Sequence, residues 1–271
     1  TRALSSAASD VYKRQLLSQV AAEHAGEVMR MRRSSNDRSL ERVKALLAGD
    51  HSQISRIDYP LELSHVGLIA HGDAAALFRQ LPKALDSSLL LVTATARTTW
   101  AWLGRRGELR VDDVRDAVSD VHDTGASIGL GEATTGVMGW RHTHRQARAA
   151  LKVATCSSTK VARYADVCLL ASVIEDDLLA PTLRDLYLKP LSQGQDRGEV
   201  YLDTLRAWFA ANRNGEATAS VLGISRQAVA NRLRVVEQRI GRSLPSCATE
   251  VEVALALAEV ERPLDSATAT T

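Results

Sequence analysis

The side chains best suited to a chemical task lie between Glu216 and Arg242, in the stretch EATASVLGISRQAVANRLRVVEQRIGR. They are arginines, a glutamine and an asparagine on a predicted helix, and such side chains form bidentate hydrogen bonds with guanine or adenine edges in the major groove. The expected DNA-binding residues are Ser225, Arg226, Gln227, Asn231, Arg232, Arg234 and Arg213, with Arg232 and Arg213 on the DNA backbone. The stretch therefore predicts an interface with double-stranded DNA.

Two helices joined by a tight turn must position these side chains. Ala219 is small enough for the helices to cross closely, and Gly223 can adopt the positive φ of the turn without steric cost. Ile224 and Val229 are expected to face inward, and Ser225 stands where an N-cap hydroxyl accepts from a free backbone N–H of the second helix. This spacing is typical of a helix-turn-helix, although two amphipathic helices with an intervening glycine also form ordinary helical hairpins.

The distribution of charge favours the DNA-binding interpretation. Seven arginines and two acids lie between Arg206 and Arg242, whereas four glutamates and one arginine lie between Thr249 and Arg262. Over Gly198 to Arg262 the eight acids and eight bases cancel, so the basic charge is segregated onto one segment. A surface that faces phosphates requires such segregation, whereas a solvated helix without a partner more often mixes its signs.

Composition places the chain among globular proteins and excludes little else. The 271 residues predict two domains or one large one, with 45% hydrophobic and 24% charged residues. The net charge of +2 alone implies no nucleic-acid partner. Three cysteines without metal-ligand spacing predict reduced thiols and a cytoplasmic protein. No run approaches the about 18 apolar residues of a membrane span, so no membrane partner is expected.

Residues 1–54 are expected to lead into the first domain. Residues 1–15 show no amphipathic period and end in AASDVYKRQ, so we interpret them as a non-native or disordered leader. Residues 16–54 have the spacing of connecting helices, with a stop at Gly49. The long, charged segment LLSQVAAEHAGEVMRMRR is typical of a helix that joins two domains, which predicts native sequence upstream of this chain.

Residues 55–175 alternate short apolar runs with helical patterns. Strands are predicted at His65–Ala70, Ser88–Thr95, Thr98–Leu103 and Ala126–Leu130, with a last strand or strand–helix junction at Val161–Leu170. Helices are predicted at Asp73–Leu85, Val111–Thr124 and Thr135–Val153. This order predicts an α+β fold in which helices cover a mainly antiparallel sheet.

The remaining residues predict an all-α domain. Residues 176–197 read as a helical connector, and its polar end SQGQDRG is the best boundary candidate. Residues 198–262 are expected to form four helices around the helix-turn-helix, the first at Glu199–Asn212 and the last at Thr249–Val260. Residues 263–271 form a tail of small residues that is predicted to be disordered.

The C-terminal residues resemble a known family. Residues 201–244, YLDTLRAWFAANRNGEATASVLGISRQAVANRLRVVEQRIGRSL, are similar to the C-terminal helix-turn-helix of the PucR/CdaR transcriptional regulators. Residues 55–175 resemble the GGDEF-like domain of that family through YPLELSHVGLIA, TTWAWLG and SIGLGEATTGVMGWRHTHRQARAAL. The resemblance covers about residues 16–262. It implies a degenerate GGDEF-like α/β sandwich, followed by a helix-turn-helix domain of a bacterial regulator.

The resemblance also carries expectations about partners and specificity. The family usually opens its recognition helix with His-Arg-Asn-Thr and continues with Tyr-Arg-Leu, whereas this chain has Ser-Arg-Gln-Ala at 225–228 and Asn-Arg-Leu at 231–233. The scaffold residue Leu233 is retained while several DNA-facing side chains differ, so the operator sequence does not transfer from relatives. A homodimer or higher homo-oligomer is implied, together with a metabolite effector sensed by an upstream domain that this chain lacks.

Two alternative functions compete with this one. A nucleotide cyclase of the GGDEF type needs acidic metal ligands at the end of its first strand and in its signature hairpin. HVGLIA contains no acid, and AWLGRRGEL has Arg105 and Arg106 where we expect the signature, so cyclase activity is disfavoured. The second alternative is a pure protein-interaction or dimerisation module.

No catalytic residue, metal site or cofactor is predicted elsewhere in the chain. Gly129-Leu130-Gly131 is a lone G-x-G that lacks the rest of a dinucleotide fingerprint. His142 and His144 are two residues apart on a predicted helix, and therefore point to different faces.

Overall fold

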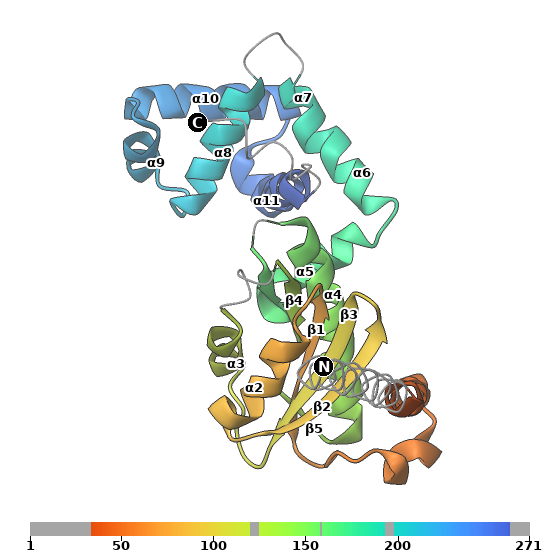
Figure 1. Cartoon of the computed structure of the whole chain (residues 1–271). Helices are drawn as coiled ribbons and strands as arrows, with labels where there is room; N and C mark the ends of the chain where they lie inside the picture. Colours follow the sequence, from red (N-terminus) through yellow and green to blue (C-terminus); the bar gives the residue numbers. More distant parts are fainter. Residues whose placement is uncertain (1–33, 120–124, 158, 193–197, 261–271) are drawn as a thin grey trace, which may run out of the picture.

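A computed structural model describes residues 34–119, 125–157, 159–192 and 198–260. These residues form an α/β lobe and a helical lobe, which lie one above the other in Figure 1. The leader at 1–15, the first part of the connecting helices at 16–33 and the tail at 263–271 lie outside the described residues. Among the described helices, none is both long and apolar enough to span a membrane.

A sheet with strand order β2-β3-β1-β4-β6 forms the centre of the α/β lobe. Its strands are β1 (Ser64–His71), β2 (Ser88–Thr95), β3 (Thr98–Arg105), β4 (Ser127–Leu130) and β6 (Val161–Arg163). A two-residue strand, β5 (Thr134–Thr135), pairs with β1. All pairs are antiparallel except β4 with β6. The predicted α+β class with a mainly antiparallel sheet is confirmed, although β5 was not anticipated.

Helices cover both faces of this sheet. The helices α2 (Ala75–Leu85) and α3 (Val111–Ala117) lie on one face, where Phe78, Leu81 and Val114 pack against inward side chains of the strands. On the other face lies α4 (Gly136–Cys156), which contacts β1 and β4 extensively. The predicted helix at Val111–Thr124 is shorter in the structure, because α3 ends at Ala117 and residues 120–124 lie outside the described residues.

Three glycines allow α4 to approach the sheet closely. A Cβ atom at Gly129 would overlap the Ala147 carbonyl oxygen and the Leu151 nitrogen of α4, and one at Gly131 would overlap Thr143. A Cβ atom at Gly67 of β1 would crowd the Thr143 backbone, and the Gly67 N–H donates a hydrogen bond to Thr143 Oγ1 at 2.8 Å. The lone G-x-G at 129–131 therefore serves helix packing, because the backbone of α4 lies where a side chain at either glycine would have to be.

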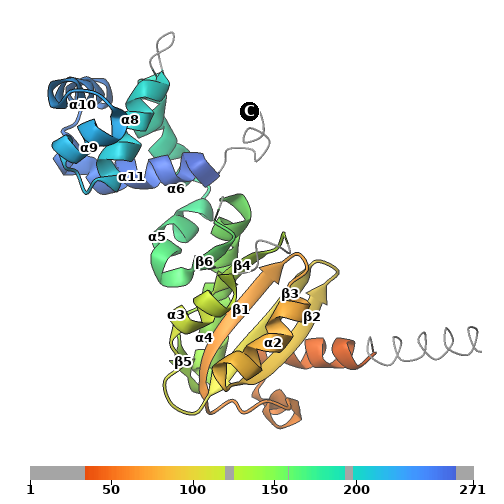
Figure 2. The same ribbon diagram turned by 60° about the vertical axis from the view of Figure 1, so that its left-hand side comes forward.

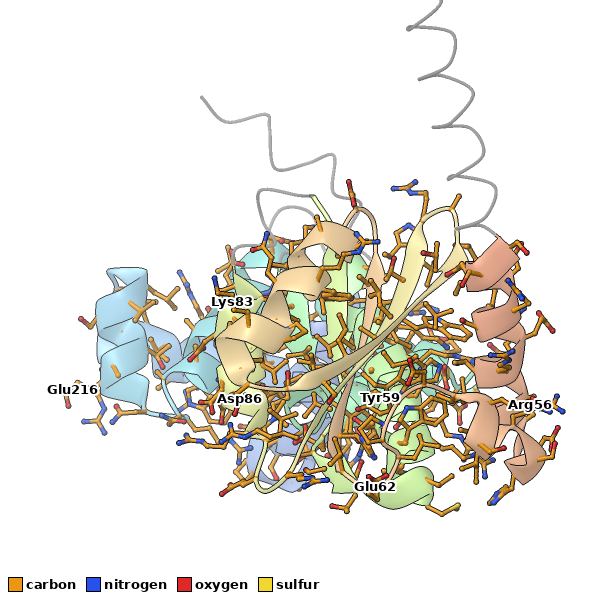
Figure 3. The ribbon with its side chains drawn as sticks, turned by 60° about the horizontal axis from the view of Figure 1, so that its bottom comes forward. Arg56, Tyr59, Glu62, Lys83, Asp86 and Glu216 are labelled. Carbon is orange, nitrogen blue, oxygen red and sulfur yellow. The ribbon has the colours of Figure 1, made fainter. Side chains whose placement is uncertain are left out.

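The helix at 34–48 belongs to the core of the α/β lobe. Its side chains Leu40, Val43 and Leu46 pack with Trp102 and Trp140. The short helix η1 (His51–Arg56) follows, and Tyr59 and Glu62, labelled in Figure 3, lie in the segment that leads from η1 into β1. The described part of residues 16–54, predicted as connecting helices, therefore contributes to a folded domain and does more than connect.

The helical lobe contains α8 (Gly198–Ala210), α9 (Gly215–Leu222), α10 (Arg226–Ile240) and α11 (Leu244–Val260). The predicted connector, residues 176–197, packs into the same core through its described part. It comprises α6 (Leu179–Leu183), the π-helix η3 (Arg184–Leu188) and α7 (Lys189–Ser192), which bury Leu183, Tyr187 and Leu191 against α8, α10 and α11. This segment is therefore more than a connector, because its apolar side chains form part of the core of the helical lobe.

The two lobes meet where α11 contacts α4 and α5 (Tyr164–Ile174). Val260 of α11 packs with Val153 of α4 and Ala171 of α5. The ion pair of Lys152 with Glu175 lies between α4 and the residue after α5. Val173 of α5 also packs in the core of the helical lobe, so α5 belongs to both sides of this junction.

Candidate nucleic-acid interface

Local capping interactions fix the positions of α9 and α10. Asn214 caps α9, its Oδ1 accepting from the N–H groups of Glu216 and Ala217 at 2.9 and 3.1 Å. Ser225 caps α10, its Oγ accepting from the Ala228 N–H at 3.1 Å, which confirms the predicted N-cap. Gly223 ends α9 with φ +64, the left-handed conformation expected for the turn.

The scaffold side chains hold the two helices together. Val229 of α10 is 1% exposed and Ala219 of α9 is 8% exposed. Ile224 in the turn and Leu233 on α10 are partly buried. The Ile224 N–H donates to the Ala219 carbonyl at 3.1 Å, which closes the turn. These contacts leave the opposite face of α10 turned to solvent.

Four of the predicted DNA-binding side chains share that exposed face. Arg226, Gln227, Asn231 and Arg234 are all exposed on α10. Asn231 Oδ1 accepts from Gln227 Nε2 at 3.3 Å and from Arg234 Nη1 at 3.2 Å. Arg226 makes no hydrogen bond or ion pair within the described residues. Arg226 and Arg234 therefore bring positive charge to this face without a neutralising carboxylate.

The sequence-based prediction missed Ala230 on the same face. Ala230 is exposed and lies four residues from both Arg226 and Arg234, so it sits in the middle of the polar stripe. A small side chain there lets the helix approach a base edge, and alanine contacts the thymine methyl group in known complexes. The helical spacing from Arg226 indicates this position, but an alanine side chain has no charge or hydrogen-bonding group that would mark it in the sequence.

Arg232 and Arg213 do not lie on this face. Arg232 is partly buried and its Nη1 donates to Thr204 Oγ1 of α8 at 3.2 Å. Arg213 lies in the turn before α9, 3.9 Å from Glu252 Oε2 and 5.6 Å from the centre of the Phe209 ring. Both side chains are engaged within the protein, and nothing in the structure directs them to the DNA that α10 would meet.

The other arginines counted in the basic segment also have internal partners. Arg206 forms ion pairs with Asp203 and Glu259 at 2.8 and 3.3 Å. Arg239 donates to the Leu191 carbonyl at 2.9 Å, and Arg242 donates to the Tyr187 hydroxyl at 2.7 Å. Most of the seven arginines between Arg206 and Arg242 therefore bind other parts of the protein. The basic charge of this segment does not all lie on the exposed face of α10.

In the α/β lobe, the structure corrects the location of the hairpin that we compared with the cyclase signature. Arg105 is the last residue of β3 and Arg106 follows it toward α3, whereas the β2–β3 hairpin turns at Ala96 and Arg97. That turn carries no carboxylate. Within the described residues, no group of three or more His, Cys, Asp or Glu side chains is arranged to hold a metal ion.

The two histidines of α4 point to different faces, as predicted. His142 is exposed, whereas His144 is 6% exposed and stacks on Trp102 with ring centres 5.0 Å apart. Burial lowers the pKa of His144 to about 4, with smaller contributions from Arg148 and Arg145. The neutral imidazole that results is part of an aromatic core.

His65 is also neutral and internal. A ring nitrogen lies 2.9 Å from the Leu61 carbonyl oxygen, so Nε2 carries the proton and donates. The other nitrogen, Nδ1, then accepts from the Tyr59 hydroxyl at 2.9 Å. Burial lowers the pKa of His65 and raises that of Tyr59. Both ring nitrogens are satisfied inside the lobe, so the histidine has a structural role.

Two family models match this chain. A family model described as the PucR C-terminal helix-turn-helix domain matches residues 201–258, and one described as a GGDEF-like domain matches residues 49–153. A crystal structure of a regulator of polyketide synthase expression from Bifidobacterium adolescentis is 18% identical, with a TM-score of 0.43. That match covers 83% of this chain and 94% of the other. A search of curated proteins finds no match.

The two matched domains follow each other along the chain in the same order as the two lobes of the structure. The GGDEF-like match spans β1 to β5, α2, α3 and most of α4, and the helix-turn-helix match spans most of α8 to α11. A GGDEF-like domain followed by this helix-turn-helix is the arrangement of DNA-binding transcriptional regulators, and the chain belongs to the PucR/CdaR family of these regulators.

Proposed function

We propose that this protein is a sequence-specific DNA-binding regulator that inserts α10 into the major groove. The observation that carries the proposal is the exposed face of α10, on which Arg226 and Arg234 have no acidic partner. Gln227, Asn231 and Ala230 lie between them and supply groups that read base edges. A helix N-terminus also favours an anion, so the first turn of α10 suits a phosphate.

A salt titration of duplex binding tests this proposal. Each phosphate contact releases a counterion, so log K falls linearly with log salt concentration and the slope counts the contacts. The double variant Arg226→Ala and Arg234→Ala should flatten the slope by about two units. The duplexes should be fragments that flank the native gene, because the specific site is unknown.

The matched control removes two other cations. Lys152 of α4 and Lys189 of α7 are partly or fully exposed and paired with Glu175 and Asp185, and neither belongs to α10. Lys152→Ala with Lys189→Ala lowers the net charge equally and should leave the salt slope unchanged. Equal slopes for the two double variants would show that α10 is not the DNA-binding surface.

We further propose that the α/β lobe serves assembly or signal relay in a cytoplasmic homodimer. Helix-turn-helix proteins mostly bind two half-sites about 10 base pairs apart, which requires two copies of the motif. The carboxylate-free β2–β3 turn supports a non-enzymatic role, since a cyclase would need metal ligands there. The effector would be a metabolite sensed by a domain upstream of this chain.

Light scattering and DNA footprinting test the assembly. A dimer mass, with two protected half-sites on the same face of the duplex, is the expected result. A monomer that protects a single half-site would contradict it. Incubation with GTP and Mg²⁺ should give no cyclic product, and its formation by the folded protein would instead support the cyclase alternative.

A further inference from the structure

A chain of hydrogen bonds links three side chains on the exposed face of α10. Gln227 and Arg234 both donate to one atom, Asn231 Oδ1, at 3.3 and 3.2 Å. The three residues are spaced four and three apart, so their side chains are neighbours on one helix face. All three are exposed, and together they form the centre of the surface proposed to meet DNA.

The chemistry of arginine determines which way the Asn231 amide points. A guanidinium group carries N–H donors and no acceptor, so only the amide oxygen of Asn231 can face Arg234. A carbonyl oxygen has two lone pairs, and here Arg234 and Gln227 occupy both. The Asn231 NH₂ group makes no hydrogen bond within the described residues and is free to donate.

This orientation conflicts with the usual pairing of asparagine with adenine. In that pair the amide oxygen accepts from adenine N6 while the NH₂ group donates to N7. With Oδ1 already filled, Asn231 would have to break its bonds to Arg234 and Gln227 to make the pair. Guanine instead presents two acceptors, N7 and O6, in the major groove, which suit a side chain that offers only donors.

We propose that Asn231 reads DNA as a donor and selects guanine, and that Arg234 is the positioning residue that sets this preference. The inference rests on the proposed insertion of α10 into the major groove. Arg234 retains further N–H groups, so Asn231 and Arg234 together present donors to the DNA. Cytosine is disfavoured at this position because its N4 group is itself a donor.

Selection of binding sites from a pool of random duplexes, with the full 271-residue chain, tests the proposal. The base position read by Asn231 is the one at which Asn231→Ala removes discrimination. The wild type should prefer guanine over adenine there by about tenfold, the scale of one good bidentate contact. Arg234→Ala frees the amide to rotate, so guanine preference over adenine should fall below about threefold or reverse.

Arg226→Ala is the matched control. It removes an exposed arginine of the same helix that makes no hydrogen bond to Asn231, so affinity should fall while the preference at the Asn231 position stays. All three substituted side chains are exposed, and circular dichroism of each variant verifies the fold. A change in base preference, rather than in affinity alone, distinguishes positioning from a simple phosphate contact.

The outcomes separate this inference from the proposed function. Adenine preference in the wild type, or guanine preference that survives Arg234→Ala unchanged, would overturn the inference and leave DNA binding intact. The same holds if salt-sensitive binding occurs without any position that depends on Asn231. If no duplex is bound in a salt-sensitive way, the proposed function itself fails.

Discussion

At the scale of single residues, His144 makes the stability of the α/β lobe depend on pH. Burial against Trp100 and Trp102 lowers its pKa from 6.5 to about 4, and its Nδ1 has no hydrogen-bond partner within the described residues. The unfolded chain therefore binds a proton between these two pH values while the folded protein does not. Stability is complete above pH 6.5 and falls as pH decreases toward 4, by about 3 kcal/mol in total.

Urea titrations at a series of pH values measure this dependence. His144→Phe keeps an aromatic ring and removes the titrating group, so its slope between pH 4 and 6.5 should be smaller by up to about 1.4 kcal/mol per pH unit. The two proteins should have the same slope above pH 7. His65 contributes in the same direction in both, because burial also lowers its pKa. Equal slopes in the acidic window would show that His144 is not the responsible group.

Gly129 tests the close approach of α4 to the sheet. Gly129→Ala places a methyl group against the Ala147 carbonyl and the Leu151 nitrogen. Both atoms belong to the backbone of α4, so they can shift only if the helix itself is displaced from the sheet. The expected loss of unfolding free energy is about 3 kcal/mol or more, as in overpacked cores. Gly215→Ala is the control, because a Cβ there meets nothing within 4 Å. Similar effects of both substitutions in chemical denaturation would contradict this packing account.

At the scale of elements, the arginines of α10 divide between two tasks. Arg239 donates to the Leu191 carbonyl and lies 4.8 Å from the centre of the Tyr201 ring, whereas Arg226 faces solvent. Arg239→Ala should therefore destabilise the helical lobe by about 1–3 kcal/mol and leave the salt slope of DNA binding unchanged. Arg226→Ala should lower that slope by about one unit and change stability by less than about 0.5 kcal/mol.

Chemical denaturation and DNA titration of the same two variants check this division. The pair serves as its own control, since each variant removes one arginine from one helix. A lower salt slope for Arg239→Ala would mean that its side chain leaves Leu191 to contact phosphate in the complex.

The same division explains how much of the fold the sequence could predict. Ser225 and Gly223 act on their own neighbours, so the turn and the start of α10 could be predicted from local spacing. The partners of Arg239 and Arg242 are Leu191 and Tyr187, about fifty residues away, and spacing carries no record of such contacts. For this reason residues 176–197 were predicted as a connector, and the contribution of α6, η3 and α7 to the core was not predicted.

Short elements of the α/β lobe were harder to predict for a different reason. β5 is two residues long and has too few positions for an alternating pattern. The strands β2 and β3 and the short link between them were predicted close to their observed positions, but the cyclase signature was sought at Arg105 and Arg106. Gly107 gives a strong turn signal after β3, whereas the turn at Ala96 and Arg97 contains no Gly, Asn or Pro. The long helices and the apolar strands, in contrast, could be predicted from their own hydrophobic patterns, and so could the layers that they form.

At the scale of the whole molecule, the contact of α11 with α4 and α5 joins the two lobes and is expected to make their unfolding cooperative. Val260 is 8% exposed and packs with Val153 and Ala171, so Val260→Asp would bury a carboxylate without a partner. Desolvation makes this unfavourable, and the expected response is that α11 separates from α4 and α5. Unfolding of the two lobes should then be less cooperative, because each has a core of its own, although Val173 of α5 packs in the core of the helical lobe.

Differential scanning calorimetry measures this uncoupling. Val260→Asp should give two transitions, or a transition whose van't Hoff enthalpy is clearly below the calorimetric enthalpy, where the wild type is more cooperative. Leu178→Asp makes a similar apolar-to-acid change at a side chain that is 77% exposed, and should leave the wild-type profile intact. Val260→Asp should still bind a single half-site, because α10 and its capping residues are unchanged. Binding to two half-sites should weaken if the junction fixes the spacing of the two motifs in a dimer. An unchanged calorimetric profile would show that the Val260 contact of α11 does not couple the two lobes.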